Sequence, residues 1–443
     1  MELSGWGGYP RAHSTIAVPR AQDEITPLFQ PRMIPRGLGR SYGDAAILDA
    51  GTVMLTERLD RIISFDKASG ILRAESGVAL NEVIARFLPL GWFPMVTPGT
   101  KFVTLGGCVA ADVHGKNHHR DGSFGEHVSD VQIALADGRV VNCSPDHLPD
   151  LFWSAVGGMG LTGVITQVEL ALRPVESAFL NVRHRAAANL SALFHLFEDD
   201  QFDDHYTVAW IDCVKQGEAM GRGIYMSGHH ASATEVERYA GNLLEPVSKR
   251  TLTARFGLPG FAFGRTSASI FNELYFRVQS RKAAPFLSDY DSFFYPLDRI
   301  KNWNVMYGKK GFVQYQCVIP TASAREGMQS LMNEIVRSGH ASMLGVLKRF
   351  GDGNPGFLSF PVAGYTLAID FPIGHPGLFT LLDRLDAITI DHGGRVYLAK
   401  DARLSRSNFA RMYPMLPKWM QIKSNVDPAA RFTSDLARRV GLT

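Results

Sequence analysis

Residues 34–44 read Ile34-Pro35-Arg36-Gly37-Leu38-Gly39-Arg40-Ser41-Tyr42-Gly43-Asp44, a glycine-rich stretch that carries two arginines. Glycine lets the backbone approach an anion closely, and successive N–H groups can then surround that anion. Residues 52–55 have the pattern of a strand, so the stretch is predicted to be a loop between two strands. A Rossmann loop or a P-loop leads into a helix instead, and both are therefore excluded. An ordinary glycine-rich turn fits this stretch alone about equally well.

Two further glycine-dense segments favour a phosphate-binding loop over an ordinary turn. Residues 97–119 contain Thr97-Pro98-Gly99-Thr100 and Leu105-Gly106-Gly107, and residues 152–165 contain Gly157-Gly158-Met159-Gly160. Each segment lies at a predicted junction between a strand and a helix. Three such loops in one N-terminal region predict a long ligand with several phosphates that lies across a sheet. A flavin dinucleotide is the natural candidate.

The composition is that of an ordinary globular enzyme. The chain has 443 residues, 45% hydrophobic and 20% charged, which allows two or three domains of about 100–200 residues. A net charge of +3 is too small to indicate a nucleic-acid partner. The scattered cysteines favour reduced thiols in a cytoplasmic protein; they are Cys108, Cys143, Cys213 and Cys317. We expect no signal peptide and no membrane-spanning helix, because no apolar run approaches about 18 residues.

Hydrophobic periodicity predicts the first elements of structure. Two hairpins are expected around residues 67–70 and 137–138, where turn residues separate short apolar runs. Residues 80–88 carry apolar side chains at the spacing of an amphipathic helix. Residues 164–172 alternate as a strand, and we place a domain boundary after it.

Several segments together resemble a known family. Residues 36–44, 98–100, 114–119 and 157–163 are similar to the FAD-binding region of the vanillyl-alcohol-oxidase-type flavoproteins. Within that superfamily the chain most closely resembles the decaprenylphosphoryl-β-D-ribose 2-oxidase family. The more specific motifs are His-Gly-Lys-Asn-His-His at 114–119, Gln-Tyr-Gln at 314–316 and Ala-Lys-Asp-Ala-Arg at 399–403. The resemblance runs from about Gly5 to the C-terminus and is weakest between residues 182 and 282.

The resemblance implies an α+β fold with the two domains of the vanillyl-alcohol-oxidase/PCMH type. It implies an FAD-binding domain over residues 1–177, a mixed-sheet substrate-binding cap over 178–394, and a return to the FAD-binding domain over 395–443. FAD is expected to bind non-covalently. Carried over position by position, the FAD-binding residues are Arg36, Gly37, Leu38, Gly39, Arg40, Ser41, Tyr42, Gly99, Thr100, Thr104, Gly106, Gly107, Ala111, His114, Gly160, Ile165 and Tyr397.

The histidine run allows three interpretations. Two of His114, His118 and His119 could share a helical face as metal ligands, but no further ligand is obvious nearby, and Gly115 weakens the helix. A solvated loop is the second interpretation. The resemblance supports the third, in which His114 packs at the edge of the flavin and no metal is bound.

Lys400 and Tyr397 are three residues apart. A helical turn would bring both to one site, whereas a strand would point them to opposite faces. From the residues alone, a surface lysine paired with Asp401 is the simpler interpretation. The resemblance implies instead that Lys400, Tyr397 and His114 are the catalytic residues and that Lys400 lies at the flavin and the sugar. Lys400 would either stabilise the reduced flavin as a cation or accept the alcohol proton, and the sequence leaves both roles open.

The resemblance places one further set of side chains around the substrate, namely Lys116, Trp210, Gln314, Gln316, Val346, Lys348, Ala368 and Lys400. In a strand Gln314 and Gln316 share one face and suit hydrogen bonds to a sugar, although an exposed strand face fits equally. Without the resemblance, Trp210 would be interpreted as a core residue and Lys348 as a solvent-exposed charge. The family's best-known inhibitors bond to a cysteine where this chain has Ala368, so the pocket wall differs and the exact sugar and lipid stay open.

The resemblance also implies a reaction. FAD would oxidise the 2-hydroxyl of a polyprenyl-phosphate ribose to the 2-keto sugar, and an NADH-dependent reductase would complete the epimerisation to the arabinose donor of cell wall arabinan. A cytoplasmic protein, peripheral at the inner membrane, is expected. Residues 258–263 and 270–276 could form an apolar flap for the lipid, although core packing explains them slightly better. The alternatives are a soluble FAD-dependent sugar, alditol or aldonolactone oxidase, and a flavin-binding subunit without catalytic activity.

Overall fold

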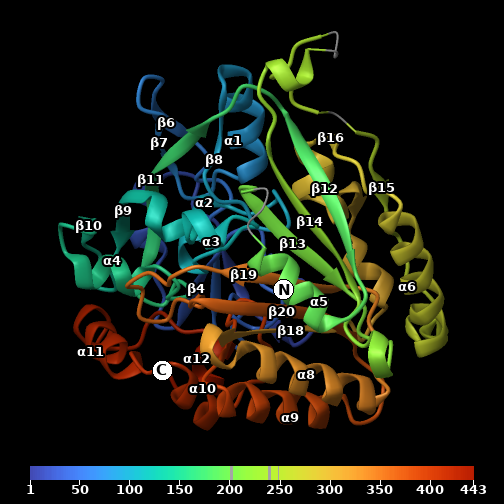
Figure 1. Cartoon of the computed structure of the whole chain (residues 1–443). Coiled ribbons are helices and arrows are strands. Elements are labelled where there is room, and N and C mark those ends of the chain that lie inside the picture. The colour runs from blue at the N-terminus through green and yellow to red at the C-terminus, as the bar shows by residue number, and fades with distance from the viewer. Residues whose placement is uncertain (200–202, 238–240, 248) are drawn as a thin grey trace.

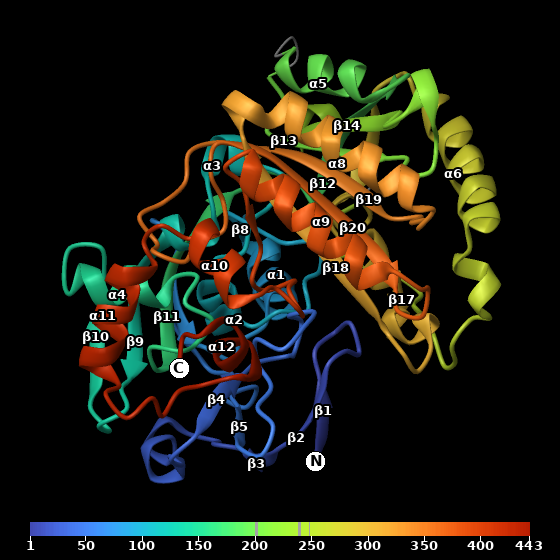
Figure 2. The same ribbon diagram turned by 90° about the horizontal axis from the view of Figure 1, so that it is seen from below.

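The computed structural model describes residues 1–199, 203–237, 241–247 and 249–443. Figure 1 shows the N-terminal part, in blue and cyan, beside a large sheet whose strands run from green to orange. The C-terminal helices, in red, lie next to the N-terminal part again (Figures 1 and 2). The fold predicted from the resemblance is confirmed: an α+β chain with two sheet-based parts.

The N-terminal part contains three sheets. A parallel sheet joins β3 (Thr15–Ala17), β5 (Thr52–Leu55) and β4 (Met33–Arg36), so the glycine-rich stretch after β4 connects two strands as predicted. The hairpin β1–β2 (Glu2–Ser4 and Arg11–His13) stands apart. The largest sheet is antiparallel and contains β6 (Ile62–Asp66), β7 (Ile71–Glu75), β8 (Trp92–Pro94), β9 (Val128–Ala134), β10 (Val140–Cys143) and β11 (Val164–Pro174). Both predicted hairpins are confirmed, as β6–β7 and β9–β10.

Short helices connect these strands, and they are α1 (Leu80–Phe87), α2 (Leu105–Ala110), α3 (His118–Asp121) and α4 (Pro149–Ala155). The predicted amphipathic helix is confirmed as α1, which buries the apolar face that the sequence indicated. Gly91 then turns the chain with a φ of 83°, a left-handed conformation that glycine adopts at little cost.

The second part is built on an eight-stranded sheet in the order β16-β12-β14-β13-β19-β20-β18-β21. Its strands are β12 (Phe179–Ala187), β13 (Tyr206–Ile211), β14 (Gly223–His230), β16 (Phe286–Asp289), β18 (Phe312–Pro320), β19 (Gly345–Phe350), β20 (Gly364–Pro372) and β21 (Arg395–Val396). We expected a mixed sheet, but all neighbours in the described sheet are antiparallel. A short parallel pair, β15 (Leu252–Thr253) with β17 (Ile300–Lys301), lies outside it. The chain leaves the large sheet only after Val396, and the domain boundaries stay predictions.

Side chains alternate between the two faces of this large sheet. On one face, Tyr315, Leu347 and Leu367 belong to the main hydrophobic core and are at most 3% exposed. Helices α5 (Leu190–Glu198), α8 (Ala324–Ser338) and α9 (Leu378–Asp391) cover that face, and α8 and α9 lie side by side (Figures 1 and 2). The neighbouring positions line a cavity on the other face, and they are Gln314, Gln316, Val346, Lys348 and Ala368. The two-residue period of the strands thus separates core from site.

The C-terminal segment returns to the N-terminal sheets through α10 (Arg406–Met412), α11 (Leu416–Val426) and α12 (Asp435–Val440). In β4, the N–H of Met33 donates to the carbonyl of Arg431, and the carbonyl of Met33 accepts from the N–H of Thr433. The indole N–H of Trp419 in α11 donates to the carbonyl of Ser154 in α4 at 3.0 Å. These contacts bring the residues after β21 next to the glycine-rich loop.

Helix α6 (Arg265–Ser280) packs on β12 and β14 and is followed by β16 and α7 (Tyr290–Phe294). Figure 1 shows α6 at the outer edge of the molecule. Phe261, Ile270 and Leu274 in this region are 78%, 66% and 61% exposed, so the core-packing interpretation of residues 258–263 and 270–276 is wrong for these side chains. No helix in the described ranges is long and apolar enough to cross a lipid bilayer.

Candidate active site

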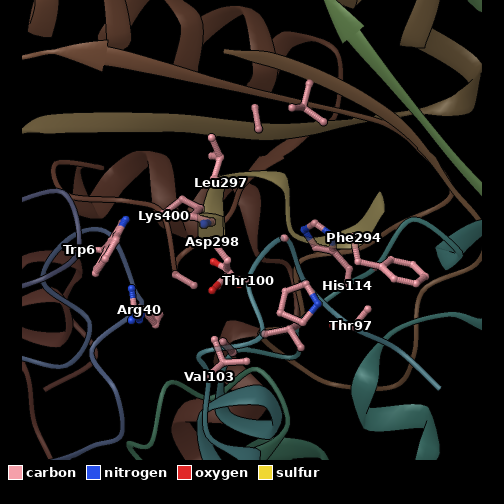
Figure 3. Close-up of a pocket in the computed structure, with 18 of the residues that line it drawn as sticks. Trp6, Arg40, Thr97, Thr100, Val103, His114, Phe294, Leu297, Asp298 and Lys400 are labelled. Atoms are coloured by element: carbon pink, nitrogen blue, oxygen red, sulfur yellow. The ribbon is translucent and has the colours of Figure 1, made fainter. Parts of the chain in front are cut away.

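A cavity of about 790 Å³ lies between the glycine-rich loops and the large sheet. Figure 3 shows Trp6 and Arg40 on one side of it and His114 and Phe294 on the other, with Lys400 and Asp298 between them. All residues predicted to bind FAD line this cavity: Arg36, Gly37, Leu38, Gly39, Arg40, Ser41, Tyr42, Gly99, Thr100, Thr104, Gly106, Gly107, Ala111, His114, Gly160, Ile165 and Tyr397. All predicted substrate-binding residues line it too: Lys116, Trp210, Gln314, Gln316, Val346, Lys348, Ala368 and Lys400. The structure brings both sets together, and their individual roles stay predictions.

The loop after β4 offers unused hydrogen-bond donors to the cavity. Among the described residues, the backbone N–H groups of Leu38 to Ser41 have no protein acceptor. The guanidinium carbon of Arg40 lies 3.9 Å from the centre of the Trp6 ring, and its buried Nε has no partner in the described chain. Gly39 has a φ of 63°, which lets the loop turn sharply. Free N–H groups beside a guanidinium suit a phosphate or diphosphate.

Arg36 lines the same cavity but is placed differently. Its two terminal nitrogens donate to the backbone carbonyls of Ala46 and Ser4 at 3.1 and 2.8 Å. Burial lowers the pKa of its guanidinium. Arg36 therefore ties the N-terminal segment to the loop, whereas Arg40 keeps its donors for a ligand.

The second glycine segment can approach the first because glycine leaves room for it. A Cβ on Gly37 would lie 2.2 Å from Oγ1 of Thr104, and a Cβ on Gly106 would lie 2.8 Å from the Cβ of Ser76. Thr104 caps helix α2, since its Oγ1 accepts the N–H of Gly107 at 3.2 Å. Larger residues at Gly37 or Gly106 would push these segments apart and open the wall of the cavity.

His114 is a neutral imidazole that is held on both sides. Its Nε2 lies 3.0 Å from the amide nitrogen of Gln316, and its Nδ1 lies 2.9 Å from Nζ of Lys348. Burial lowers the pKa of His114 well below its usual range, and the charge of Lys348 adds to this effect. In the part of the chain that the structure describes, no group of three or more His, Cys, Asp or Glu side chains is placed to hold a metal ion.

A turn brings Tyr397 and Lys400 to the same wall of the cavity. The N–H of Lys400 donates to the carbonyl of Tyr397 at 3.0 Å. Nζ of Lys400 lies 3.6 Å from the centre of the Tyr42 ring. The interpretation of a surface lysine paired with Asp401 is wrong, because Asp401 pairs instead with Arg439 at 2.8 Å.

Three lysines extend into the cavity. Burial lowers the pKa of Lys116 to about 7, and burial together with the charges of Lys116 and Lys400 lowers that of Lys348 to about 7. Nζ of Lys116 donates to the carbonyl of Phe293 and lies 4.1 Å from the centre of that ring. In the described lining, Asp298 is the one acidic residue. The site is therefore suited to anionic ligands.

The two glutamines of β18 face the cavity together. The amide nitrogen of Gln314 donates to Oδ1 of Asp370 at 2.6 Å, and that of Gln316 donates to Oγ1 of Thr366 at 3.2 Å. Gln316 is only 3% exposed, so an exposed strand face does not describe it. Trp210 is buried, as expected of a core residue, yet it also lines the cavity.

Sequence reasoning missed Trp6, Asp298 and Asp370. Trp6 lies under the guanidinium of Arg40, and Asp298 accepts the N–H of Lys101 at 2.9 Å. Asp370 holds the amide of Gln314 from outside the cavity lining. Each comes from a segment distant in sequence from the group it contacts, and no local motif marks it.

Comparison with known proteins agrees with this geometry. Residues 29–144 match a family model described as an FAD binding domain, and residues 304–440 match one described as D-arabinono-1,4-lactone oxidase. The chain is 37% identical to the decaprenylphosphoryl-β-D-ribose oxidase of Mycolicibacterium smegmatis over 414 residues, which cover 93% of this chain and 89% of that protein. The chain belongs to the family of that oxidase.

Two other proteins similar to this chain are less informative. An uncharacterised protein of Streptomyces coelicolor is 34% identical over 384 residues, which cover 82% of this chain and 100% of that protein. The Δ24-sterol reductase of Rattus norvegicus is 26% identical over 147 residues, which cover 33% of this chain and 28% of that protein.

FAD is the cofactor of this flavin-dependent oxidoreductase. The unused N–H groups of residues 38–41 and the guanidinium of Arg40 fit its diphosphate, and the cavity leads from them to His114 and Lys400. When bound, FAD accepts a hydride from the substrate carbon. The protein contributes the binding surface and the charges around that carbon.

The two arginines of the first loop predict opposite mutational effects. Arg40→Ala should weaken FAD binding by roughly ten- to a hundredfold, because a charged hydrogen bond contributes about 1.5–3 kcal/mol. Fluorescence titration of the apoprotein with FAD measures this affinity. Arg36→Ala is the matched control and should lower the melting temperature of the apoprotein more than Arg40→Ala does, since it leaves two carbonyls unpaired. Equal FAD affinity in Arg40→Ala and the parent would contradict the assignment.

Proposed function

We propose that this protein oxidises the 2-hydroxyl of a polyprenyl-phosphate ribose to the 2-keto sugar, with FAD as the oxidant. The 37% identity over 93% of the chain supports this substrate class. The structural observation that carries the proposal is the lining of the cavity, which combines a cationic region at Lys116, Lys348 and Lys400 with a mostly apolar region beside α6, called the apolar arm below. A free sugar needs no such arm, whereas a lipid-linked sugar phosphate uses both regions.

The cationic region suits the polar part of that substrate. Oxidation removes a hydride from C2 and a proton from its hydroxyl, which leaves a ketone. Nζ of Lys348 and the imidazole of His114 lie 2.9 Å apart and reach the cavity from β19 and from the loop before α3. Lys116 lines the same cavity and can bind the substrate phosphate. In a water-poor cavity such charges act strongly on a developing negative charge.

The apolar arm suits the lipid. It is lined by β12, β14 and α6 through Val182, Met226, Phe271, Tyr275 and Phe286, with His184, Gln279 and Lys282 as its polar members. The ring centroids of Tyr275 and Trp210 are 4.8 Å apart, so the arm begins directly at the predicted substrate site. Burial of each CH₂ group of a lipid there contributes about 0.8 kcal/mol.

The outer side of α6 suggests how the lipid is delivered. Ile270, Leu274 and Val278 follow each other at four-residue spacing and are 66%, 61% and 45% exposed. Exposed basic side chains flank them, namely Arg255, Arg265, Arg281 and Lys282. An apolar stripe with basic flanks is typical of helices that lie on an anionic bilayer. We therefore propose peripheral membrane contact through α6 of a cytoplasmic protein.

Two further features belong to this proposal. FAD binds non-covalently, which is supported by the engagement of both ring nitrogens of His114 with Gln316 and Lys348. The 2-keto product is the substrate of a separate NADH-dependent reductase, which would complete the epimerisation to the arabinose donor. Acid precipitation of the yellow protein should therefore release FAD into the supernatant.

A second candidate function rests on the match of residues 304–440 to the D-arabinono-1,4-lactone oxidase model. In this case the protein would oxidise a free sugar or lactone and would not use the apolar arm. A flavin-binding subunit without catalysis is a third class. These three functions can be distinguished by testing a lipid-linked sugar, a free sugar and a lactone as substrates.

We predict that polyprenyl-phosphate ribose in detergent bleaches the visible flavin absorbance of the holoenzyme under anaerobic conditions and yields a ketone. Free ribose and arabinono-1,4-lactone should not bleach it, because neither fills the apolar arm. Bleaching by the lactone but not by the lipid-linked sugar would favour the second candidate. An unchanged spectrum with every substrate would favour the non-catalytic subunit.

The membrane contact has its own test. The variant Ile270→Ser/Leu274→Ser/Val278→Ser should lose co-sedimentation with phosphatidylcholine–phosphatidylglycerol vesicles by about a hundredfold or more, since each inserted side chain contributes about 1.5–3 kcal/mol. The matched control Ile63→Ser/Val140→Ser/Leu148→Ser removes side chains that are 46%, 50% and 46% exposed on other elements. The control should bind like the parent. Equal binding of all three proteins would exclude α6 as the contact.

A further inference from the structure

We propose that Asp112 is a positioning residue that holds the imidazole of His114 in the wall of the cavity. Its carboxylate joins the segment that carries His114 (residues 111–125) to the loop between β19 and β20 (residues 351–363). This role goes beyond the proposed function, because it concerns the FAD-binding cavity itself and applies whichever alcohol is oxidised. Asp112 lies outside the described lining of the cavity, so it acts through His114 and not on a ligand.

The carboxylate of Asp112 is completely buried and accepts hydrogen bonds from both segments. From its own segment, the N–H of Gly125 donates to Oδ1 at 2.9 Å, and the hydroxyl of Ser123 donates to Oδ2 at 2.9 Å. From the β19–β20 loop, the amide nitrogen of Asn354 donates to Oδ2 at 2.8 Å, and the hydroxyl of Ser359 donates to the same oxygen. One carboxylate thus connects two segments that are far apart in sequence.

The segment that carries His114 is closed at this carboxylate. His114 and Ser123 pair as an isolated antiparallel bridge, and the Ser123 hydroxyl donates to Asp112. On the other side of Asp112, the carbonyl of Ala111 accepts the hydroxyl of Tyr397 at 2.7 Å. Asp112 therefore lies between the attachment points of two residues that are predicted to be catalytic.

The β19–β20 region supplies aromatic neighbours of His114. Phe350 ends β19, and Phe360 lies in the loop that follows it. Their ring centroids lie 4.8 and 5.8 Å from that of His114. The ring of Phe360 also stacks on that of Tyr397 at 4.6 Å. Because Asp112 binds both segments, its carboxylate fixes the imidazole relative to the rings that enclose it.

The position of His114 matters for two further cavity side chains. Its Nε2 lies 3.0 Å from the amide nitrogen of Gln316, and its Nδ1 lies 2.9 Å from Nζ of Lys348. Both side chains line the cavity and are predicted to bind the substrate. Displacement of the imidazole would take a partner from each of them, which is unfavourable for buried polar groups. Control of His114 by Asp112 therefore extends to Gln316 and Lys348.

The backbone of Asp112 is itself constrained. Its φ is 41°, in the left-handed region that residues with a side chain seldom adopt. Aspartate and asparagine tolerate this conformation better than most. Strained residues of this kind persist where the surrounding structure fixes them, and they are frequent at active sites. Asp112→Asn therefore changes the charge and the hydrogen bonding but leaves the backbone preference in place.

Asp112 and Asn354 form a pair whose roles can be exchanged. Oδ1 of Asn354 accepts the N–H of Gly356 at 2.9 Å, while its nitrogen donates to Asp112. After Asn354→Asp, one carboxylate oxygen can accept from Gly356 and the other from an amide at position 112. After Asp112→Asn, the side-chain oxygen can still accept the N–H of Gly125. The neighbouring serine hydroxyls can rotate to donate or to accept.

The test measures how readily His114 reacts in the holoenzyme with saturating FAD and without substrate. Diethyl pyrocarbonate modifies neutral imidazoles, and tandem mass spectrometry of the peptides gives the rate for each histidine. In Asp112→Asn, the new amide faces the amide of Asn354. The rate at His114 should rise about ten- to a hundredfold, the factor that corresponds to the loss of one charged hydrogen bond.

An internal reference separates this effect from a general loss of stability. His230 also has both ring nitrogens buried and lies outside the two segments. General loosening of the fold would raise the rates at His114 and His230 together, whereas the proposed role predicts a change in their ratio. Because no substrate is present, the result does not depend on whether the proposed function is right.

The exchange Asp112→Asn/Asn354→Asp is the sharpest variant, since it retains the contact and the net charge. It should return the His114-to-His230 ratio to near the parental value. Ser359→Ala removes a single donor and should raise the ratio by a smaller factor, which keeps the test open if Asp112→Asn does not retain FAD.

Asp212→Asn is the matched control. Asp212 is also buried, at 1% exposed, and pairs with Arg222 at 3.0 Å, so its replacement should leave the ratio unchanged. A parental ratio in both Asp112→Asn and Ser359→Ala would overturn the proposal. So would a ratio that the double exchange fails to restore, or an equal rise in Asp212→Asn.

Discussion

The site depends on a buried ion group in which Arg439 joins Asp44 to Asp401. Arg439 of α12 donates to the two oxygens of Asp44 at 2.7 and 2.9 Å and pairs with Asp401 at 2.8 Å. The two aspartates are only 2% and 4% exposed, so removal of Arg439 would leave buried charges unpaired at a cost of about 3–5 kcal/mol. Asp44 ends the glycine-rich loop and Asp401 follows Lys400. The group thus fixes the loop to the turn that carries the lysine.

Backbone contacts complete this junction. The N–H of Tyr42 donates to the carbonyl of Ala399 at 2.8 Å, and a Cβ on Gly43 would lie 1.9 Å from the carbonyl oxygen of Asp401. Only glycine allows this approach. The ring of Tyr42 is therefore held under Lys400, and the lysine lies next to the loop that is predicted to bind the diphosphate. Enclosing several cations is unfavourable for the free protein, and an anionic cofactor or substrate relieves it. Ligand binding should accordingly stabilise the fold.

Local sequence patterns predicted the elements that need only local information. The helix at 80–87, both hairpins and the loop between β4 and β5 follow from periodicity and glycine spacing. The lining of the cavity was predicted through the family resemblance, since no spacing rule relates residue 114 to 348 or 400. The antiparallel direction of the large sheet was not predicted, because pairing direction depends on connections that composition does not reveal. Asp370 and Arg439 were missed for a similar reason: each acts on a residue that only the closed fold brings near. Sequence alone could not show that one apolar face of α6 is exposed to solvent. The helix carries apolar residues on two sides, and only the fold determines which of them is buried.

This junction places Lys400 in the wall of the cavity, where its charge can act on the oxidation. The most direct measurement is the anaerobic stopped-flow rate of flavin reduction by lipid-linked ribose at saturation in Lys400→Met, which keeps the length of the side chain and removes its charge. We expect a rate about 10²–10³-fold below that of the parent, which is typical for the loss of one electrostatic contact to a developing charge, with FAD still bound. Flavin reduction at the parental rate in Lys400→Met would show that the charge of Lys400 does not assist the oxidation.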